Sequence, residues 1–210
     1  MQEFFTEDIQ QLNKLVRASF INSLGGFKSL VLVGTRNSNK QENLAPFSSL
    51  FHIGANPALC GLIVRPDEVP RHTLSNILET QEYTVNHVNE GMYFKAHQSS
   101  ARYASEDSEF ESVELSPEYK HGIMAPFVKE SAVQFACKLE QKIDLEINGT
   151  ILIIGKIIYV NIPDNSLCAD GFIDIEAAGT LTLSGLDSYH STTRLARLSY
   201  AKPGSWPKEI

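Results

Sequence analysis

The chain has 210 residues, a formal net charge of −7, 42% hydrophobic residues and 20% charged residues. This composition is typical of a globular protein with a sizeable core, and the length suits one large domain or two small ones. The negative charge argues against a nucleic-acid partner, which usually requires a basic face. The start of the chain lacks a signal-peptide pattern, and no apolar run approaches the ~18 residues of a membrane span. We therefore expect a cytoplasmic protein without a membrane partner.

The first third of the chain predicts one helix and two buried strands. Apolar residues recur at helical spacing over residues 6–20, and Thr6 can cap that helix. The runs KSLVLVGT (28–35) and ALCGLIV (58–64) are apolar and short, as is typical of buried strands. Between them, the polar stretch NLAPFSS (43–49) is expected to form a loop.

The next third predicts a helix, a strand and a less regular region. TLSNILET (73–80) has the pattern of a short helix capped by Thr73. EYTVNHV (82–88) alternates between apolar and polar residues, which indicates a strand. Residues 90–126 show little periodicity, so we expect a helix followed by a long surface excursion.

A long β-hairpin over residues 131–162 is the strongest local signal. Apolar residues alternate with polar ones on both sides of Asn148-Gly149, a dipeptide that favours a type I′ turn. Long curled hairpins with one apolar face close readily into barrels. The sequence therefore predicts a mainly β fold, an antiparallel barrel with peripheral helices, in which residues 1–210 form a single domain.

Motifs for common catalytic chemistry are missing from the chain. It contains no HExxH, P-loop, GxSxG or GxGxxG, and its six histidines are scattered without ligand spacing, so we expect no metal site and no catalytic side chain. The cysteines Cys60, Cys137 and Cys168 are far apart and are interpreted as buried, reduced thiols. An enzyme with this profile often leaves the hard chemical step to a cofactor.

Several segments occur together in an order that resembles the flavin reductase-like family, the FMN-binding split barrels that include flavoredoxin. They are NLAPFSSL, Arg65, RHTLSNI and YTVNHV, followed by EFESVELSP, KESAVQFACKLEQ, IIGKIIYVNI, DGFID and RLARLSYA. The resemblance covers residues 25–202. It implies an antiparallel, Greek-key split barrel, FMN as the cofactor, and a homodimer with the flavin near the subunit interface. The chain departs from the family pattern at GGFKSL, where a Pro-Arg-Pro-like approach is usual, and at His72, where Asp is common.

The resemblance assigns the flavin ring to the loop 43–49, with Gly34 and Thr35 at its border. A flavin has a flat apolar ring with an amide-like pyrimidine edge, and a bare backbone segment can pair with that edge. The candidate residues are Asn43, Leu44, Ala45, Pro46, Phe47, Ser48 and Ser49. The alternative is that Pro46 and Phe47 only turn the chain and plug one end of a barrel.

A second element is expected to bind the FMN phosphate. Its candidate residues are Arg65, Arg71, His72, Thr73 and Asn76. Arginine neutralises a phosphate of about −1.5 to −2 charge, and a helix start offers N–H groups and a favourable dipole. The alternatives are that both arginines pair with Asp67 and Glu68, and that His72 and Asn76 only face solvent.

Two functions compete at this point. In the first, NAD(P)H delivers hydride to the flavin, which passes electrons to another flavin or a small acceptor. In the second, the protein is a non-catalytic FMN-binding electron carrier or flavin store. A third, weaker possibility is a barrel that binds another planar ligand. His52 is interpreted as lining the open flavin face or as a packed histidine, and Arg194 and Arg197 as phosphate or interface contacts or as solvated strand residues.

Overall fold

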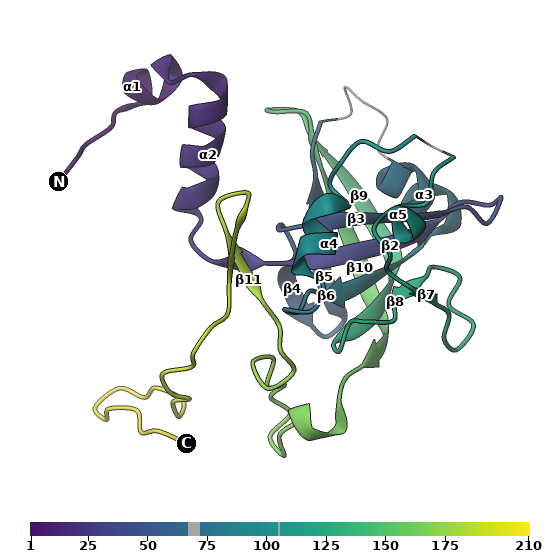
Figure 1. Ribbon diagram of the computed structural model, residues 1–210. Helices are drawn as coiled ribbons and strands as arrows, with labels where there is room; N and C mark the ends of the chain where they lie inside the picture. Colours follow the sequence, from purple (N-terminus) through teal and green to yellow (C-terminus); the bar gives the residue numbers. More distant parts are fainter. Residues whose placement is uncertain (67–71, 105) are drawn as a thin grey trace.

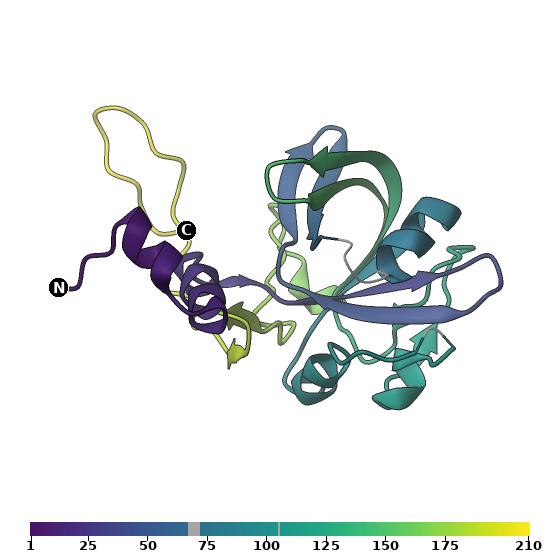
Figure 2. The same cartoon turned by 90° about the horizontal axis from the view of Figure 1, so that it is seen from above.

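The computed structural model describes residues 1–66, 72–104 and 106–210. In this part of the chain, seven strands form one antiparallel sheet in the order β3-β2-β6-β9-β10-β5-β4 (Figure 1). The strands are β2 (Val31–Arg36), β3 (Glu42–Phe47), β4 (Phe51–Ala55), β5 (Ala58–Val64), β6 (Glu82–His87), β9 (Gln134–Leu145) and β10 (Thr150–Asn161). The sheet curls strongly when it is seen from above (Figure 2).

Two small sheets and short helices surround this sheet. One small sheet has the order β1-β11-β12, and the other pairs β7 with β8. Their bounds are β1 (Lys28–Ser29), β11 (Thr182–Ser184), β12 (Ser188–His190), β7 (Pro117–Glu118) and β8 (Phe127–Val128). The helices are α1 (Thr6–Gln11), α2 (Lys14–Leu24), α3 (His72–Thr80), α4 (Tyr93–Gln98), α5 (Glu109–Ser112) and a 3-10 turn at Asp164–Ser166. Among the described residues, the helices are too short or too polar to traverse a lipid bilayer.

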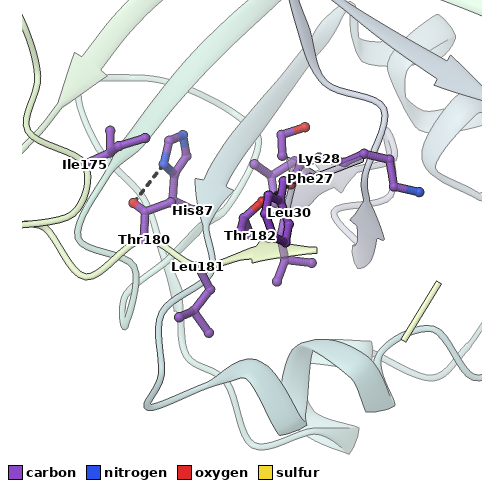
Figure 3. A pocket seen from close by; sticks show the side chains of 10 residues that line it. Phe27, Lys28, Leu30, His87, Ile175, Thr180, Leu181 and Thr182 are labelled. Carbon is purple, nitrogen blue, oxygen red and sulfur yellow. Dashed lines mark hydrogen bonds between the residues drawn. The ribbon is translucent and has the colours of Figure 1, made fainter. Parts of the chain in front are cut away.

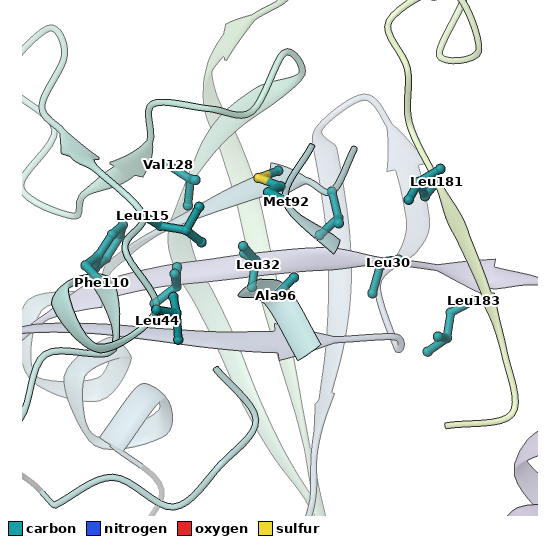
Figure 4. Close-up of a cluster of buried hydrophobic side chains, with 12 residues drawn as sticks. Leu30, Leu32, Leu44, Met92, Ala96, Phe110, Leu115, Val128, Leu181 and Leu183 are labelled. Atoms are coloured by element: carbon teal, nitrogen blue, oxygen red, sulfur yellow. The ribbon is translucent and has the colours of Figure 1, made fainter. Parts of the chain in front are cut away.

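Alternation along β2 divides the apolar residues between two cores. Val31 and Val33 face the barrel interior, which also contains Leu62, Tyr83 and Ile153. Leu30, Leu32 and Leu44 face the other way and pack with residues of α4, α5 and the segments around them, as Figure 4 shows. The sheet therefore has one apolar core inside the barrel and a second one outside, beneath α4 and α5.

Both chain ends project from the barrel on the same side (Figures 1 and 2). We call residues 6–27, which include α1 and α2, the N-terminal arm, and residues 191–210 the C-terminal arm. The C-terminal arm contains isolated bridges but no regular strand in its described residues.

The mainly β, antiparallel fold with peripheral helices is confirmed. The strand at 58–64 and the long hairpin are present, and the strand predicted at 82–88 ends at His87. The strand predicted at 28–35 is divided into β1 and β2, because Lys28–Ser29 pairs with β11. The single-domain organisation stays a prediction.

Four local predictions are wrong, each for a physical reason. The helix at 6–20 is interrupted, because the Asn13 side chain accepts a hydrogen bond from Leu15 N at 3.0 Å and starts a second helix. The stretch 43–49 is mostly strand, since residues 42–47 pair with β2. The hairpin turn has four residues, of which Gly149 alone has a positive φ, 70°, so it is not type I′. The predicted threonine caps are absent, because Thr73 lies inside α3 and Thr6 lies inside α1, whose N-cap is Phe5.

The cysteines are free, as predicted, but only two of them are buried. Cys60 and Cys137 meet inside the barrel with their sulfur atoms 3.6 Å apart, and Cys60 Sγ lies 4.0 Å from the Tyr83 hydroxyl. Burial raises the pKa of Tyr83 well above its usual value, so this hydroxyl stays protonated. Cys168 is only half-buried, because it lies in the segment after β10 and outside the barrel.

Candidate functional site

Four buried polar side chains meet where β2, β3 and α3 converge. Asn43 Nδ2 donates to Thr73 Oγ1 at 3.0 Å and to Thr35 Oγ1 at 3.2 Å. Asn76 Nδ2 also donates to Thr35 Oγ1, at 3.2 Å. Because buried polar groups need partners, these hydrogen bonds let polar residues occupy the end of an apolar barrel.

The strand register and the helix spacing bring these residues together. Thr35 lies opposite Asn43 in the β2–β3 pair, so both side chains share one face of the sheet. On α3, Thr73 and Asn76 are three residues apart and therefore lie on the same side. Leu74 and Ile77 of the same helix pack into the barrel core, which fixes α3 over this end.

The structure thus brings together three predicted site residues, Asn43, Thr73 and Asn76. The interpretation of Asn76 as a solvated residue is wrong, because it is buried on α3. Their role as cofactor ligands stays a prediction, and their visible hydrogen bonds are to each other and to Thr35.

The backbone of β3 has a second distinctive feature, a free edge. β3 pairs with β2 on one side and ends the sheet in the described part of the chain. Leu44 N points to the free edge, because it donates to Glu109 Oε2 at 3.0 Å. Since backbone groups alternate in direction along an antiparallel strand, the Pro46 carbonyl points the same way. Pro46 has no N–H, and at an edge this removes no ladder hydrogen bond.

The side chains of the β3 segment have different surroundings. Leu44 belongs to the outer core, whereas Ala45 and Phe47 lie opposite Val33 and Val31 and face the barrel interior. Phe47 packs against the interior core. This agrees with the interpretation that Phe47 plugs one end of the barrel. The Pro46 carbonyl points to the free edge of β3, where it can accept a hydrogen bond from another partner.

The turn between β3 and β4 is tied to β5. Ser49 Oγ accepts from Ile63 N at 3.1 Å and donates to Ile63 O at 3.0 Å, and Ser48 is half-buried beside it. Arg65 directly follows β5 and is exposed. Arg71, and the Asp67 and Glu68 considered as its ion-pair partners, lie outside the described residues.

Glu109 is a buried carboxylate in the segment that the sequence analysis expected to be a surface excursion. Burial raises its pKa, while hydrogen bonds from backbone N–H groups and the charge of His72 act in the opposite direction. His72 is half-buried and, with Glu109 and Asn76, lines a small cavity of about 80 Å³. The one sequence signal for this burial is Phe110, the large apolar residue next to Glu109.

Comparison with known proteins places the chain in a family. The flavin reductase like domain matches residues 24–172. The chain belongs to this flavin reductase-like family. A candidate flavin reductase with a split barrel domain from Shewanella frigidimarina NCIMB 400 is 49% identical, with a TM-score of 0.93 over 96% of this chain and 100% of that one.

More distant relatives share parts of this likeness. Flavoredoxin of Desulfovibrio vulgaris (Miyazaki F) is 20% identical, with a TM-score of 0.71 over 86% of this chain and 92% of that one, which shows the fold alone. An uncharacterized protein of Aquifex aeolicus is 31% identical over 60% of this chain, and the match spans 64% of the relative's own length. The predicted family and its split-barrel fold are thereby confirmed.

This flavin reductase-like chain also has a larger cavity, of about 230 Å³, beside β1 and β6 (Figure 3). Its polar side chains include Lys28, His87 and Thr180, and the rest of its lining is mainly apolar. His87 Nδ1 lies 3.1 Å from Thr180 Oγ1, and burial lowers the pKa of His87 to about 4. Burial lowers the pKa of Lys28, as does the charge of Arg65. The sequence analysis missed both Lys28 and His87.

Arg194, Arg197 and His52 are the remaining candidates from the sequence, and the two arginines form ion pairs with nearby aspartates. Arg194 pairs with Asp174 at 3.0 Å, and Arg197 pairs with Asp170. The Arg197 guanidinium lowers the pKa of Asp170, whereas the pKa of Asp174 is lowered first by a hydrogen bond from the Ala177 backbone N–H and then by Arg194. The Arg197 guanidinium also lies 4.1 Å from the centre of the Phe172 ring. His52 on β4 is exposed, so its interpretation as a packed histidine is wrong.

Proposed function

We propose that this flavin reductase-like protein is an FMN-dependent oxidoreductase that takes hydride from NAD(P)H and passes electrons to a flavin or another small acceptor. We further propose that it works in the cytoplasm as a homodimer. The observation that carries the proposal is the free backbone edge of β3, which begins at the buried Thr–Asn cluster. Family membership and the likeness to a candidate flavin reductase support it.

The edge of β3 suits the polar rim of a flavin. The Pro46 carbonyl points outward, and Ser48 follows it with an N–H group and a hydroxyl. Ala45 and Pro46 are compact, so a planar ring can approach the backbone closely. The Leu44 N–H is already bound by Glu109, and we therefore assign ring contacts to residues 45–48 rather than to the start of the strand.

The phosphate is assigned to the charged groups near the start of α3 and the end of β5. Arg65 is exposed and supplies a guanidinium with five N–H donors. Thr73 Oγ1 already accepts from Asn43, so the Thr73 hydroxyl hydrogen remains available to donate to an anion. Arg71 and His72 precede it in the chain and are proposed as further donors.

FMN supplies the hydride-accepting N5 atom when it is bound, and the protein's own residues orient and hold it. The backbone at Pro46 fixes the pyrimidine edge, and Arg65 neutralises the phosphate. No acid or base side chain is required at the reacting atom, in keeping with a chain that lacks the usual catalytic motifs.

The test is an anaerobic titration of purified protein with FMN, followed by NADH or NADPH. We expect saturable FMN binding and rapid bleaching of the flavin absorbance, with catalytic turnover when free flavin is added as acceptor. Bound FMN that stays oxidised with both nucleotides would instead support the electron carrier or flavin store. A protein that cannot be loaded with FMN would overturn both and favour another planar ligand.

A further inference from the structure

The larger cavity, of about 230 Å³, is lined by three separate parts of the chain (Figure 3). β1 and the start of β2 form one wall, His87 at the end of β6 forms the second, and residues between 175 and 182 form the third. Phe27, the last residue of the N-terminal arm, also lines it. Ligand sites in proteins are typically concave and mostly apolar, with a few polar groups that orient the ligand. This cavity has that character, and its volume suits a small molecule rather than a nucleotide.

Most polar groups at the cavity are already used within the protein. Lys28 Nζ donates to Gly185 O at 2.6 Å, and the side chain extends away from His87 (Figure 3). Thr182 Oγ1 donates to Lys28 O at 2.7 Å. Within the described residues, no carboxylate lines the cavity. The cavity therefore favours a neutral ligand, because a charged one would lose its hydration without gaining a counter-charge.

His87 is the exception, because one of its ring nitrogens is open to a ligand. Nδ1 lies 3.1 Å from Thr180 Oγ1. The Thr180 hydroxyl has no other acceptor in the described part of the chain, so we assign its hydrogen to Nδ1 and the imidazole proton to Nε2. Nε2 itself has no protein partner within residues 1–66, 72–104 and 106–210. Since the pKa of His87 is about 4, the ring is neutral at neutral pH and offers one N–H donor.

The cavity adjoins the segment to which the flavin ring is assigned. Val31, which lines it, pairs with Phe47 of β3 on one side and with His87 of β6 on the other. Directly paired residues share a face of the sheet, and neighbouring strands are about 4.7–4.9 Å apart, so His87 lies on the order of 10 Å from Phe47. Ser29, another lining residue, donates through its hydroxyl to the Leu50 carbonyl at 2.9 Å, in the turn after β3. A molecule in the cavity is therefore close to a ring held at the end of β3.

We propose that this cavity binds a small neutral quinone as the electron acceptor, with His87 Nε2–H donating to one quinone carbonyl and the apolar walls packing on the ring. A quinone combines a flat apolar body with a carbonyl acceptor and takes up two electrons, which are the properties that the cavity and the proposed function require together. NAD(P)H supplies a hydride and the solvent a proton, so that both carbonyls become hydroxyls and the products are hydroquinone and NAD(P)⁺. His87 orients the carbonyl and keeps its own proton. The inference rests on the proposed function for its source of electrons, but quinone binding itself can be measured without flavin.

The first experiment measures binding of duroquinone to flavin-free protein by equilibrium dialysis. Its four methyl groups block addition of the Cys168 thiol to the ring. Ile175 is 43% exposed at the rim of the cavity, so Ile175→Trp can fill the cavity without disturbing the core. We expect it to weaken duroquinone binding by at least about 10-fold, because overpacking an occupied site is costly. The matched control is Ile147→Trp at the hairpin tip, where the side chain is 95% exposed, and it should bind as the wild type does.

A pair of substitutions tests the hydrogen bond from His87. His87→Leu removes the donor and should weaken duroquinone binding by about 3- to 10-fold. His87→Gln retains an N–H donor and should recover part of that loss. Circular dichroism of each variant verifies that the barrel is folded.

The second experiment follows turnover of the FMN-loaded protein with NAD(P)H. Ile175→Trp should raise the KM for duroquinone, whereas bleaching of bound FMN by NAD(P)H should be unchanged. If bleaching slows in parallel, the cavity belongs to the nicotinamide and the quinone assignment is wrong. Duroquinone that does not bind the flavin-free protein, or that binds Ile175→Trp and the wild type equally, would also overturn it. A protein that binds duroquinone in the expected order of variants but never takes up FMN would refute the proposed function and leave the quinone site standing.

Discussion

The side-chain amide of Asn43 donates to the hydroxyl of Thr73 across 3.0 Å and joins an edge strand to the first turn of α3. Its second N–H donates to Thr35, so the amide is fully used as a donor inside the protein. The contact has two consequences. It closes one end of the barrel, and it orients the Thr73 hydroxyl hydrogen away from Asn43.

We expect Thr73→Val to destabilise the protein by about 1–3 kcal/mol, because it leaves a buried Asn43 N–H without its acceptor. The free energy of unfolding, measured by urea denaturation without FMN, tests this. The control Ser75→Ala changes an exposed residue of the same helix and should stay within about 0.5 kcal/mol of the wild type. Equal stability of Thr73→Val and the wild type would show that the hydrogen bond contributes nothing.

Arg65→Ala should weaken FMN binding by about 10- to 100-fold, because one charge-assisted hydrogen bond contributes roughly 1.5–3 kcal/mol. Riboflavin lacks the phosphate, and its affinity should be the same in both proteins. Fluorescence quenching of each flavin measures the two dissociation constants. The control Arg102→Ala removes another exposed arginine, outside the proposed phosphate site. If riboflavin binding falls as much as FMN binding, Arg65 acts on the ring or on the fold, and its assignment to the phosphate is wrong.

The buried His87 makes stability depend on pH. Its pKa is about 4 in the folded protein and near 6.5 when unfolded, so the unfolded chain binds a proton that the folded chain does not. Stability should therefore fall as the pH drops from about 6.5 to about 4 and level off below, by at most about 3 kcal/mol. The His87→Gln variant lacks this histidine and therefore lacks its contribution to the pH dependence of stability.

The measurement is the difference in unfolding free energy between wild type and His87→Gln over this pH range. That difference should shift in favour of the variant as the solution becomes acidic. His52→Gln changes an exposed histidine on β4 and serves as the control. Parallel pH profiles for the wild type and His87→Gln would mean that His87 has the same proton affinity in both states.

Gly155→Ala should destabilise the barrel by about 1–3 kcal/mol through overpacking. A β-carbon there would overlap the Tyr83 hydroxyl and lie 2.8 Å from Tyr83 Cζ and 3.0 Å from Cys137 Cβ. Thermal denaturation compares it with Gly25→Ala, where the nearest atom to a new β-carbon is 3.7 Å away. Adding Tyr83→Phe should recover part of the loss, and a double variant no more stable than Gly155→Ala would point to another source of strain.

The regular strands could be predicted from sequence because the spacing of their apolar residues follows directly from which side chains are buried. β5 and the β9–β10 hairpin alternate or run apolar over many residues, and both were found. β3 was missed because Pro46 and its polar neighbours indicate a loop. An edge strand needs ladder hydrogen bonds on one side only, so it tolerates a proline that a central strand does not.

The candidate site was only partly predictable, because its contacts join distant segments. Asn43, Thr73 and Asn76 were identified through the family resemblance, but their mutual hydrogen bonds depend on how α3 packs over β2 and β3. Glu109 carries no local signal, since an acidic stretch usually faces solvent. Its burial follows from a hydrogen bond with Leu44, 65 residues earlier in the chain.

The placement of the cysteines has a practical consequence for labelling. Cys60 and Cys137 lie inside the barrel, whereas Cys168 is half-buried in the segment that follows β10. A maleimide dye added to the native protein should therefore attach at Cys168 first. One fluorophore per chain, without any engineered attachment point, would make the subunits countable by single-molecule photobleaching.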